Sequence, residues 1–307
     1  MRHFGKLLFC GLLLLSGCNP QAASDPSDKP YVVATSTILA DLTQEVARDK
    51  IELKSILKPG EDPHIYEPVP QDSIALERAD LIFYNGYDLE PALIRLIEAT
   101  GIRAKKVAVA EQITPLMDEA ENLPDPHVWG DAKNGIIMVE VIRDALIELL
   151  PEKADNLRQN AQGLIEQLEA LDQWILAQIA TIPPENRKLV TTHDAFAYYA
   201  DAYGLEILGT LIGVSTEEQP SAQTLSQLAN EVRGQNIPMV FAETTINPAL
   251  METLARESGA VLSSQNLYSD SIGGVGSSGD SYISMLVANT TAIVEGLGGT
   301  VTPFDPN

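Results

Sequence analysis

The sequence predicts an α/β protein of two lobes, each with a mainly parallel central sheet flanked by helices, joined by one long helix. Three observations predict this class. Short β-rich runs alternate with helical runs from residue 31 onward, which is typical of βαβ units. One long periodic segment interrupts the alternation, which then resumes. A chain of 307 residues has room for two domains of ordinary size.

The first half of the chain, residues 30–150, is expected to form the N-terminal lobe. Apolar, β-branched runs indicate its strands, and apolar residues at helical spacing indicate its helices. Asn85-Gly86, directly after one of the strands, is a turn signal. The expected strands are 31–38, 51–57, 81–84 and 106–110, and the expected helices are 41–47, 70–79, 91–99 and 136–150.

Residues 151–182 are predicted to form the linking helix. Apolar residues recur there at steps of three and four from Leu157 to Ile179. Pro151 is tolerated in a first helical turn, and Pro183-Pro184 ends the segment. At 1.5 Å per residue, such a helix is roughly 45 Å long, enough to span two lobes.

Residues 183–307 are expected to form the C-terminal lobe, where the alternation resumes. No short-period repeat is present, so a solenoid is excluded. The expected strands are 188–192, 205–211, 239–243 and 260–264, and the expected helices are 195–203, 222–234, 248–258 and 281–297.

The N-terminus has the layout of a signal peptide. A basic start precedes the apolar stretch Leu7–Leu15, which is too short to span a bilayer. Leu15-Ser16-Gly17-Cys18 resembles a bacterial lipobox, which implies cleavage after residues 1–17 and acylation of the Cys18 thiol. Residues 18–29 are then a flexible tether to the membrane, and the protein is extracytoplasmic. An ordinary secretory signal with a chance cysteine is the alternative.

Charge and cysteine content exclude several function classes. The chain has 43 acidic and 20 basic residues, so it lacks the basic footprint of a nucleic-acid-binding protein. Its only cysteines are Cys10 and Cys18, which leaves no thiol in the mature domain for a disulfide, a zinc ligand or a nucleophile.

Three histidines remain after the signal segment, His64, His127 and His193, and all lie where predicted elements end or begin. His64 and His193 follow strands, one in each half, and ligands of open α/β sheets gather beyond the carboxyl ends of strands. Imidazole is the commonest metal ligand. No local motif joins the three, and by spacing alone a histidine is more often an ordinary hydrogen-bonded residue than a metal ligand.

An oxygen ligand is expected from Asp280, at the end of the glycine-rich segment 273–281 and at the start of a predicted helix. Helix capping is the alternative role for this carboxylate. The segment lacks the Gly-Lys-Ser/Thr of a P-loop and carries no basic residue, which excludes a phosphate site.

At these residues the chain resembles the cluster A-I solute-binding proteins, the manganese and zinc receptors of ABC transporters (periplasmic solute-binding protein family 9). The resemblance covers essentially all of residues 30–300. The matching motifs are PGEDPHIYEP at 59–68, ADLIFYNG at 79–86, DPHVW at 125–129, THDAFAY at 192–198, and finally Asp270-Ser271 with Gly279–Tyr282.

The resemblance implies two lobes on a single rigid helix and one Mn²⁺ or Zn²⁺ ion held in the cleft as transported cargo. Its implied ligands are His64 and His127 from the first lobe and His193 and Asp280 from the second. Glu243 is implied to follow a strand toward the same cleft. The implied protein is a monomer that delivers its metal to a permease, and release is expected to involve movement of the glycine-rich loop.

The choice of metal stays open. Many manganese receptors of the family have Glu where His193 stands, and a third imidazole favours zinc. Dedicated zinc receptors often carry a His-rich acidic loop, whereas residues 111–126 are acidic without histidine. Two other functions remain as alternatives. One is a metal-dependent hydrolase with three ligands, a bound water and a base such as Glu243, and the other is a surface adhesin.

Overall fold

The computed structural model describes residue 1 and residues 29–118, 122–218 and 220–306. Residues 2–17 of the predicted signal peptide, the lipidation site Cys18 and all but the last residue of the tether lie outside the described residues. Within the described ranges, no helix is both long and apolar enough to cross a bilayer.

The first half is built on a four-stranded parallel sheet of order β2-β1-β3-β4. Parallel strands are buried on both faces, and their side chains alternate accordingly. Val33 and Ile82 face one hydrophobic cluster, whereas Val32 and Phe83 face the other. The strands are β1 (Tyr31–Ala34), β2 (Glu52–Ser55), β3 (Leu81–Tyr84) and β4 (Lys105–Ala108).

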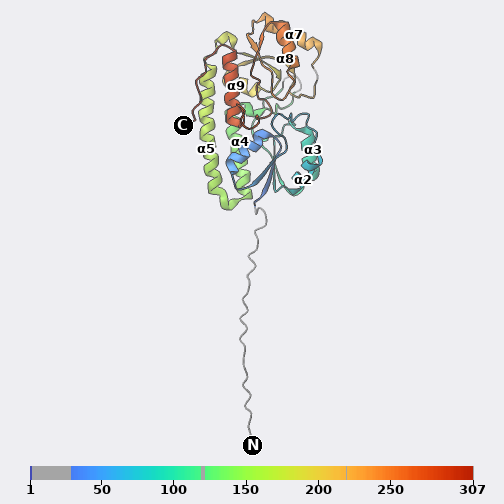
Figure 1. Cartoon of the computed structure of the whole chain (residues 1–307), viewed down its shortest axis with the longest axis vertical. Coiled ribbons are helices and arrows are strands. Elements are labelled where there is room, and N and C mark those ends of the chain that lie inside the picture. The colour runs from blue at the N-terminus through green and yellow to red at the C-terminus, as the bar shows by residue number, and fades with distance from the viewer. Residues whose placement is uncertain (2–28, 119–121, 219, 307) are drawn as a thin grey trace.

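Helices cover both faces of this sheet. Helices α2 (Pro70–Arg78) and α3 (Pro91–Thr100) pack together on one side, and α1 (Thr37–Ala47) lies on the other (Figure 1). Helix α1 begins earlier than expected because the Ser36 side chain accepts a hydrogen bond from the Leu39 N–H and caps it.

Two long helices run beside α1. Helix α4 (Ala132–Leu149) is followed by a 3₁₀ turn (Pro151–Lys153) and then by α5 (Ala154–Ile179), which confirms the predicted long helix. Its apolar stripe from Leu157 to Ile179 is buried against neighbouring helices. In Figure 1, α5 runs the height of the folded part of the molecule.

The second half repeats the α/β pattern with shorter strands. Its strands form two parallel pairs, β5-β6 and β7-β8, and a hydrogen bond from Phe241 N to Val190 O (3.0 Å) joins the pairs. The predicted α/β fold class is therefore confirmed. The strands are β5 (Lys188–His193), β6 (Glu206–Ile212), β7 (Met239–Val240) and β8 (Val261–Leu262).

The last helix joins the two halves. Helices α7 (Ala222–Gly234) and α8 (Ala249–Ser258) pack within the second half, whereas α6 (Ala197–Tyr203) also contacts the first half at residues 128–130. Helix α9 (Tyr282–Gly296) packs on both α5 and α1. Further 3₁₀ turns are Ala110–Gln112, Val128–Gly130 and Pro184–Asn186. The lobe boundaries at residues 150 and 182 stay a prediction.

Candidate metal centre

Three histidine rings meet at the junction of the two halves. His64 lies in the loop after β2, His127 directly before a 3₁₀ turn, and His193 is the last residue of β5. Their ring centroids are 5.3–5.9 Å apart, and the Nε2 atoms of His64 and His127 are 3.2 Å apart. All three are buried, with at most 4% of their surface exposed. The three histidines predicted from the sequence are thus brought together.

The carboxylate that joins them is Asp270. Its Oδ1 lies 3.5 Å from His127 Nε2, and its Oδ2 lies 3.3 Å from His193 Nε2. Ligand atoms of all four residues lie within 4.8 Å of one another. The cluster therefore contains three imidazoles and one carboxylate, as expected, but with Asp270 in the position expected for Asp280.

Asp280 is exposed and engaged elsewhere, so the expectation for this residue is corrected. Its carboxylate accepts hydrogen bonds from Gly276 N (2.9 Å) and from Ser284 Oγ (3.3 Å). Ser281, and not Asp280, caps α9 through a bond from Ser284 N. Asp280 thus stabilises the glycine-rich loop and the first turn of the helix.

Long-range pairing places Asp270 at the site. Leu267 forms a parallel bridge with Glu243, extending the β7-β8 side of the sheet by one step. Trp129 Nε1 donates to Ser269 O at 2.8 Å, which ties the segment before Asp270 to the 3₁₀ turn after His127. The sequence signal was present in Asp270-Ser271, but two aspartates stood in the same motif region.

Carboxylates behind two of the histidines set their tautomers. Asp125 Oδ1 lies 2.7 Å from His127 Nδ1, and Glu243 Oε2 lies 2.5 Å from His193 Nδ1. An imidazole that donates its Nδ1–H to a carboxylate presents the lone pair of Nε2 on its other side, here toward the cluster. Glu243 therefore orients His193 from behind, as a supporting residue.

A third carboxylate fixes the loop of His64. Asp62 Oδ1 accepts from His64 N at 2.9 Å, while its Oδ2 accepts from Thr216 Oγ1 at 2.7 Å. Thr216 belongs to the second half of the chain, so Asp62 holds the His64 loop against that half.

Burial and mutual charge shape the electrostatics. Burial lowers the pKa of His64 to about 3, so this ring is neutral at physiological pH. Burial opposes charge on both His193 and Asp270. The carboxylates of Glu243 and Asp270 nevertheless hold the pKa of His193 well above its usual range. In turn, His193, together with His127 and His64, holds the pKa of Asp270 well below its usual range. The cluster thus keeps a carboxylate anion in a buried place.

The donor atoms fit a transition-metal ion. His193 Nε2 and both oxygens of Asp270 are buried and form no hydrogen bond within the described structure, which is costly for polar atoms unless another partner binds them. In tetrahedral zinc sites, ligand atoms bound at about 2.0–2.1 Å lie roughly 3.3 Å from one another. The separations of 3.2, 3.3 and 3.5 Å in the cluster are close to that value.

The fold and the cluster define a class, an α/β metal-binding protein whose candidate site lies between its two halves. The family of the zinc-uptake complex component A, periplasmic, matches residues 32–296. The chain belongs to this family, and the resemblance predicted from the motifs is confirmed.

Relatives and solved structures agree with this assignment. The chain is 34% identical to the manganese-binding lipoprotein MntA of Halalkalibacterium halodurans, over 96% of this chain and 98% of that protein. It is 35% identical to the manganese ABC transporter substrate-binding lipoprotein PsaA of Streptococcus pneumoniae, over 94% of this chain and 96% of that protein. The periplasmic zinc-binding protein TroA of Treponema pallidum superposes with a TM-score of 0.84 at 35% identity, covering 88% and 99% of the two chains.

Proposed function

We propose that this protein captures one Mn²⁺ or Zn²⁺ ion and delivers it to an ABC-transporter permease. The proposed ligands are His64, His127, His193 and Asp270. The observation that carries the proposal is the convergence of these buried side chains, three of whose donor atoms have no hydrogen-bond partner in the described structure. Relatives named as manganese or metal receptors of ABC transporters support the same function.

Capture fits this donor set better than catalysis does. Hydrolytic zinc keeps three protein ligands and one position for water. Here four protein side chains surround the centre, and the candidate base Glu243 bonds to His193 and to two backbone N–H groups instead of facing the cluster. A receptor that must hold its cargo without reacting needs a closed coordination sphere of this kind.

The place of action follows from the relatives and the N-terminal motif together. We infer that the protein works outside the cytoplasm, as a monomer anchored to a membrane by a lipid on Cys18. Relatives named as lipoproteins support the anchor, as does the lipobox-like sequence.

Both metals remain in the proposal for a chemical reason. Three imidazoles and one carboxylate suit zinc, the softer and lower-coordinate ion, while a carboxylate with two available oxygens can raise the coordination number for manganese. Relatives that bear each metal in their names are similar to this chain to nearly the same degree.

Calorimetric titration of the metal-stripped protein tests the proposal. We expect saturable one-to-one binding of Zn²⁺ and of Mn²⁺. The comparison variant is Asp270→Ala, which lacks the one anionic ligand of the proposed set. Absence of saturable binding of either ion to the wild-type protein would overturn the receptor function.

A further inference from the structure

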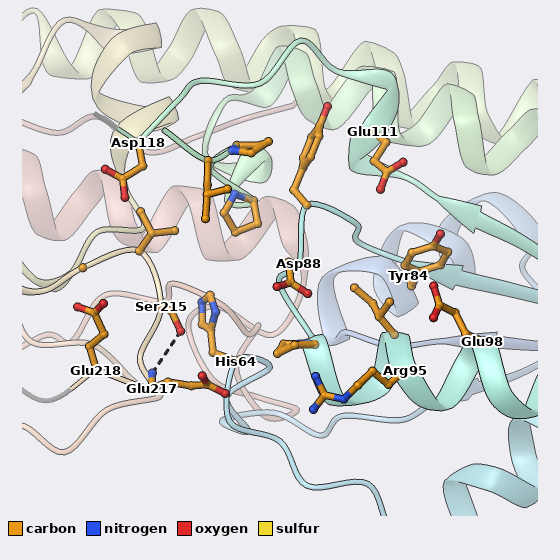
Figure 2. A pocket seen from close by; sticks show the side chains of 18 residues that line it. His64, Tyr84, Asp88, Arg95, Glu98, Glu111, Asp118, Ser215, Glu217 and Glu218 are labelled. Atoms are coloured by element: carbon orange, nitrogen blue, oxygen red, sulfur yellow. Dashed lines mark hydrogen bonds between the residues drawn. The ribbon is translucent and has the colours of Figure 1, made fainter. Parts of the chain in front are cut away.

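A cavity of about 830 Å³ lies directly beside the metal centre (Figure 2). Both halves of the chain line it. The first half contributes the end of β3, the start of α3 and parts of the segment 111–126, and the second half contributes the segment 213–218. The cavity is therefore a space between the halves and not a pocket of one of them.

The wall of this cavity is strongly acidic. Among the lining residues that the structure describes, Arg95 is the only lysine or arginine, against six carboxylates. Five of the six are exposed to solvent and have no ion pair within the described part of the chain. These five, which we call the acidic rim, are Asp88, Glu98, Glu111, Glu217 and Glu218.

The rim acts on its neighbours as a negative field. Burial raises the pKa of the Tyr84 and Tyr87 hydroxyls, and the carboxylate of Glu111 raises both further. Both tyrosines line the same cavity. A negative field in this place disfavours anions and favours cations.

The cavity reaches the metal cluster at its inner end, because His64 belongs to both. His64 lines the cavity and is only 4% exposed, while its Nε2 faces His127 at 3.2 Å. Beyond His64 lie the metal-ligand atoms of His193 and Asp270, which have no hydrogen-bond partner in the described structure. An ion in the cavity is thus one side chain away from the remaining ligands, and His64 is the first ligand that it meets.

We propose that the acidic rim is the path by which a hydrated divalent cation approaches the metal centre, with His64 as the first ligand to replace water. This inference rests on the proposed function, because it concerns access to the same centre. Clefts lined by charges of one sign concentrate ions of the opposite sign and raise association rates by about 10- to 1,000-fold. Because the rim carboxylates are exposed, salt screens them, so they act on the association rate and not on the bound state.

Stopped-flow mixing of metal-stripped protein with Mn²⁺ or Zn²⁺ tests the path. Trp129 reports binding by fluorescence, since its ring lies 5.3 Å from that of His127. The rim variant is Asp88→Asn/Glu217→Gln/Glu218→Gln, in which asparagine suits the positive φ of residue 88. The matched control, Glu152→Gln/Glu166→Gln/Glu169→Gln, removes three exposed carboxylates at or near α5, away from the cavity.

We expect the rim variant to bind metal about 10-fold more slowly at low salt, with an unchanged dissociation rate and a weaker dependence on salt. The control should keep the wild-type association rate. Equal association rates in wild type and rim variant, with binding intact, would overturn the path while leaving the receptor function standing. Equal slowing in rim and control variants would also overturn it, because net charge alone would then explain the effect.

A third outcome would assign the rim to a protein partner. If the rim variant binds metal at the wild-type rate but loses metal transfer to the permease in proteoliposomes, the carboxylates form a docking surface and the proposed path is wrong. Failure of the wild-type protein to bind either metal is the separate result that defeats the proposed function itself.

Discussion

Glu243 holds His193 through both of its carboxylate oxygens. Oε2 lies 2.5 Å from His193 Nδ1, and Oε1 accepts the backbone N–H groups of Thr192 and His193 at 2.9 Å each. Asp125 supports His127 differently, since its Oδ1 alone accepts both the ring Nδ1 (2.7 Å) and the backbone N–H (2.9 Å). The hydrogen bonds to His193 and Thr192 therefore use both oxygens of Glu243, whereas those to His127 use a single oxygen of Asp125.

This difference predicts unequal effects of two isosteric changes. In Glu243→Gln, the amide oxygen must keep the two backbone bonds, so its NH₂ group faces Nδ1 and forces the proton of His193 onto Nε2. That proton blocks the metal, and we expect affinity to fall about 10- to 100-fold. In Asp125→Asn, the amide oxygen can take the place of Oδ1 and accept both hydrogen bonds, so the loss of metal affinity should be smaller. Calorimetry on both variants measures the difference, and a larger loss in Asp125→Asn would contradict this account.

Asp270 and Asp280 give a second prediction. Asp270→Asn removes the only anionic ligand of the cluster and should weaken either metal by more than the roughly 100-fold typical of supporting residues. Asp280→Asn changes only the bonds to Gly276 and Ser284 and should leave affinity unchanged. Parallel titrations decide between them, and the reverse ranking would restore Asp280 as the ligand.

Metal selectivity is expected to depend on residue 193. Replacing imidazole by carboxylate should weaken zinc more than manganese, by on the order of 10-fold in the ratio of affinities. Because the new carboxylate would face that of Glu243, the informative variant is His193→Glu/Glu243→Gln, whose amide can donate to it. Glu243→Gln alone is the control, and an unchanged zinc-to-manganese ratio between the two variants would remove the selectivity role.

Glu90 should make stability depend on pH. Burial raises its pKa from 4.5 to about 7, against hydrogen bonds from Asn85 N and Thr35 Oγ1. Because the folded state holds this proton more tightly than the unfolded state, the free energy of unfolding falls as pH rises from 4.5 to about 7. The loss from this one group is about 3 kcal/mol.

Urea denaturation of the metal-free protein at a series of pH values measures this loss. Glu90→Gln cannot titrate, so its stability relative to wild type should improve by about the same 3 kcal/mol across that pH interval. Parallel stability curves for the two proteins would show that Glu90 titrates normally in the fold.

The segment that carries Asp270 is expected to respond to metal. Ile272 N donates to Thr37 Oγ1, and Gly273 N donates to Gly279 O at 2.7 Å, which closes the glycine-rich loop directly after the ligand. Metal binding should therefore slow hydrogen exchange in residues 270–272 and, through that closure, in 273–279. Helix α7 is the internal control, and equal protection of 273–279 with and without metal would exclude this loop from release.

The sequence by itself determined the α/β class, the long helix and the three histidines. Hydrophobic periodicity is local, so strand β3 and helix α7 were predicted at the residues where they occur. His193 could be assigned to the edge of a sheet because it ends a strand, and strand ends are visible in the sequence. The shortness of β7 was not visible, because pairing with β8 sets its length and not local propensity.

Only the tertiary structure decided which aspartate completes the cluster. Asp270 and Asp280 stand ten residues apart in one polar, glycine-rich stretch, and the sequence favoured Asp280 because it ends the glycine-rich loop at the start of a predicted helix. Two long-range contacts place Asp270 at the cluster. The Glu243–Leu267 bridge joins residues 24 positions apart, and the hydrogen bond from Trp129 to Ser269 joins residues 140 positions apart. Contacts at such separations depend on how whole elements pack, and no local pattern in the chain encodes them.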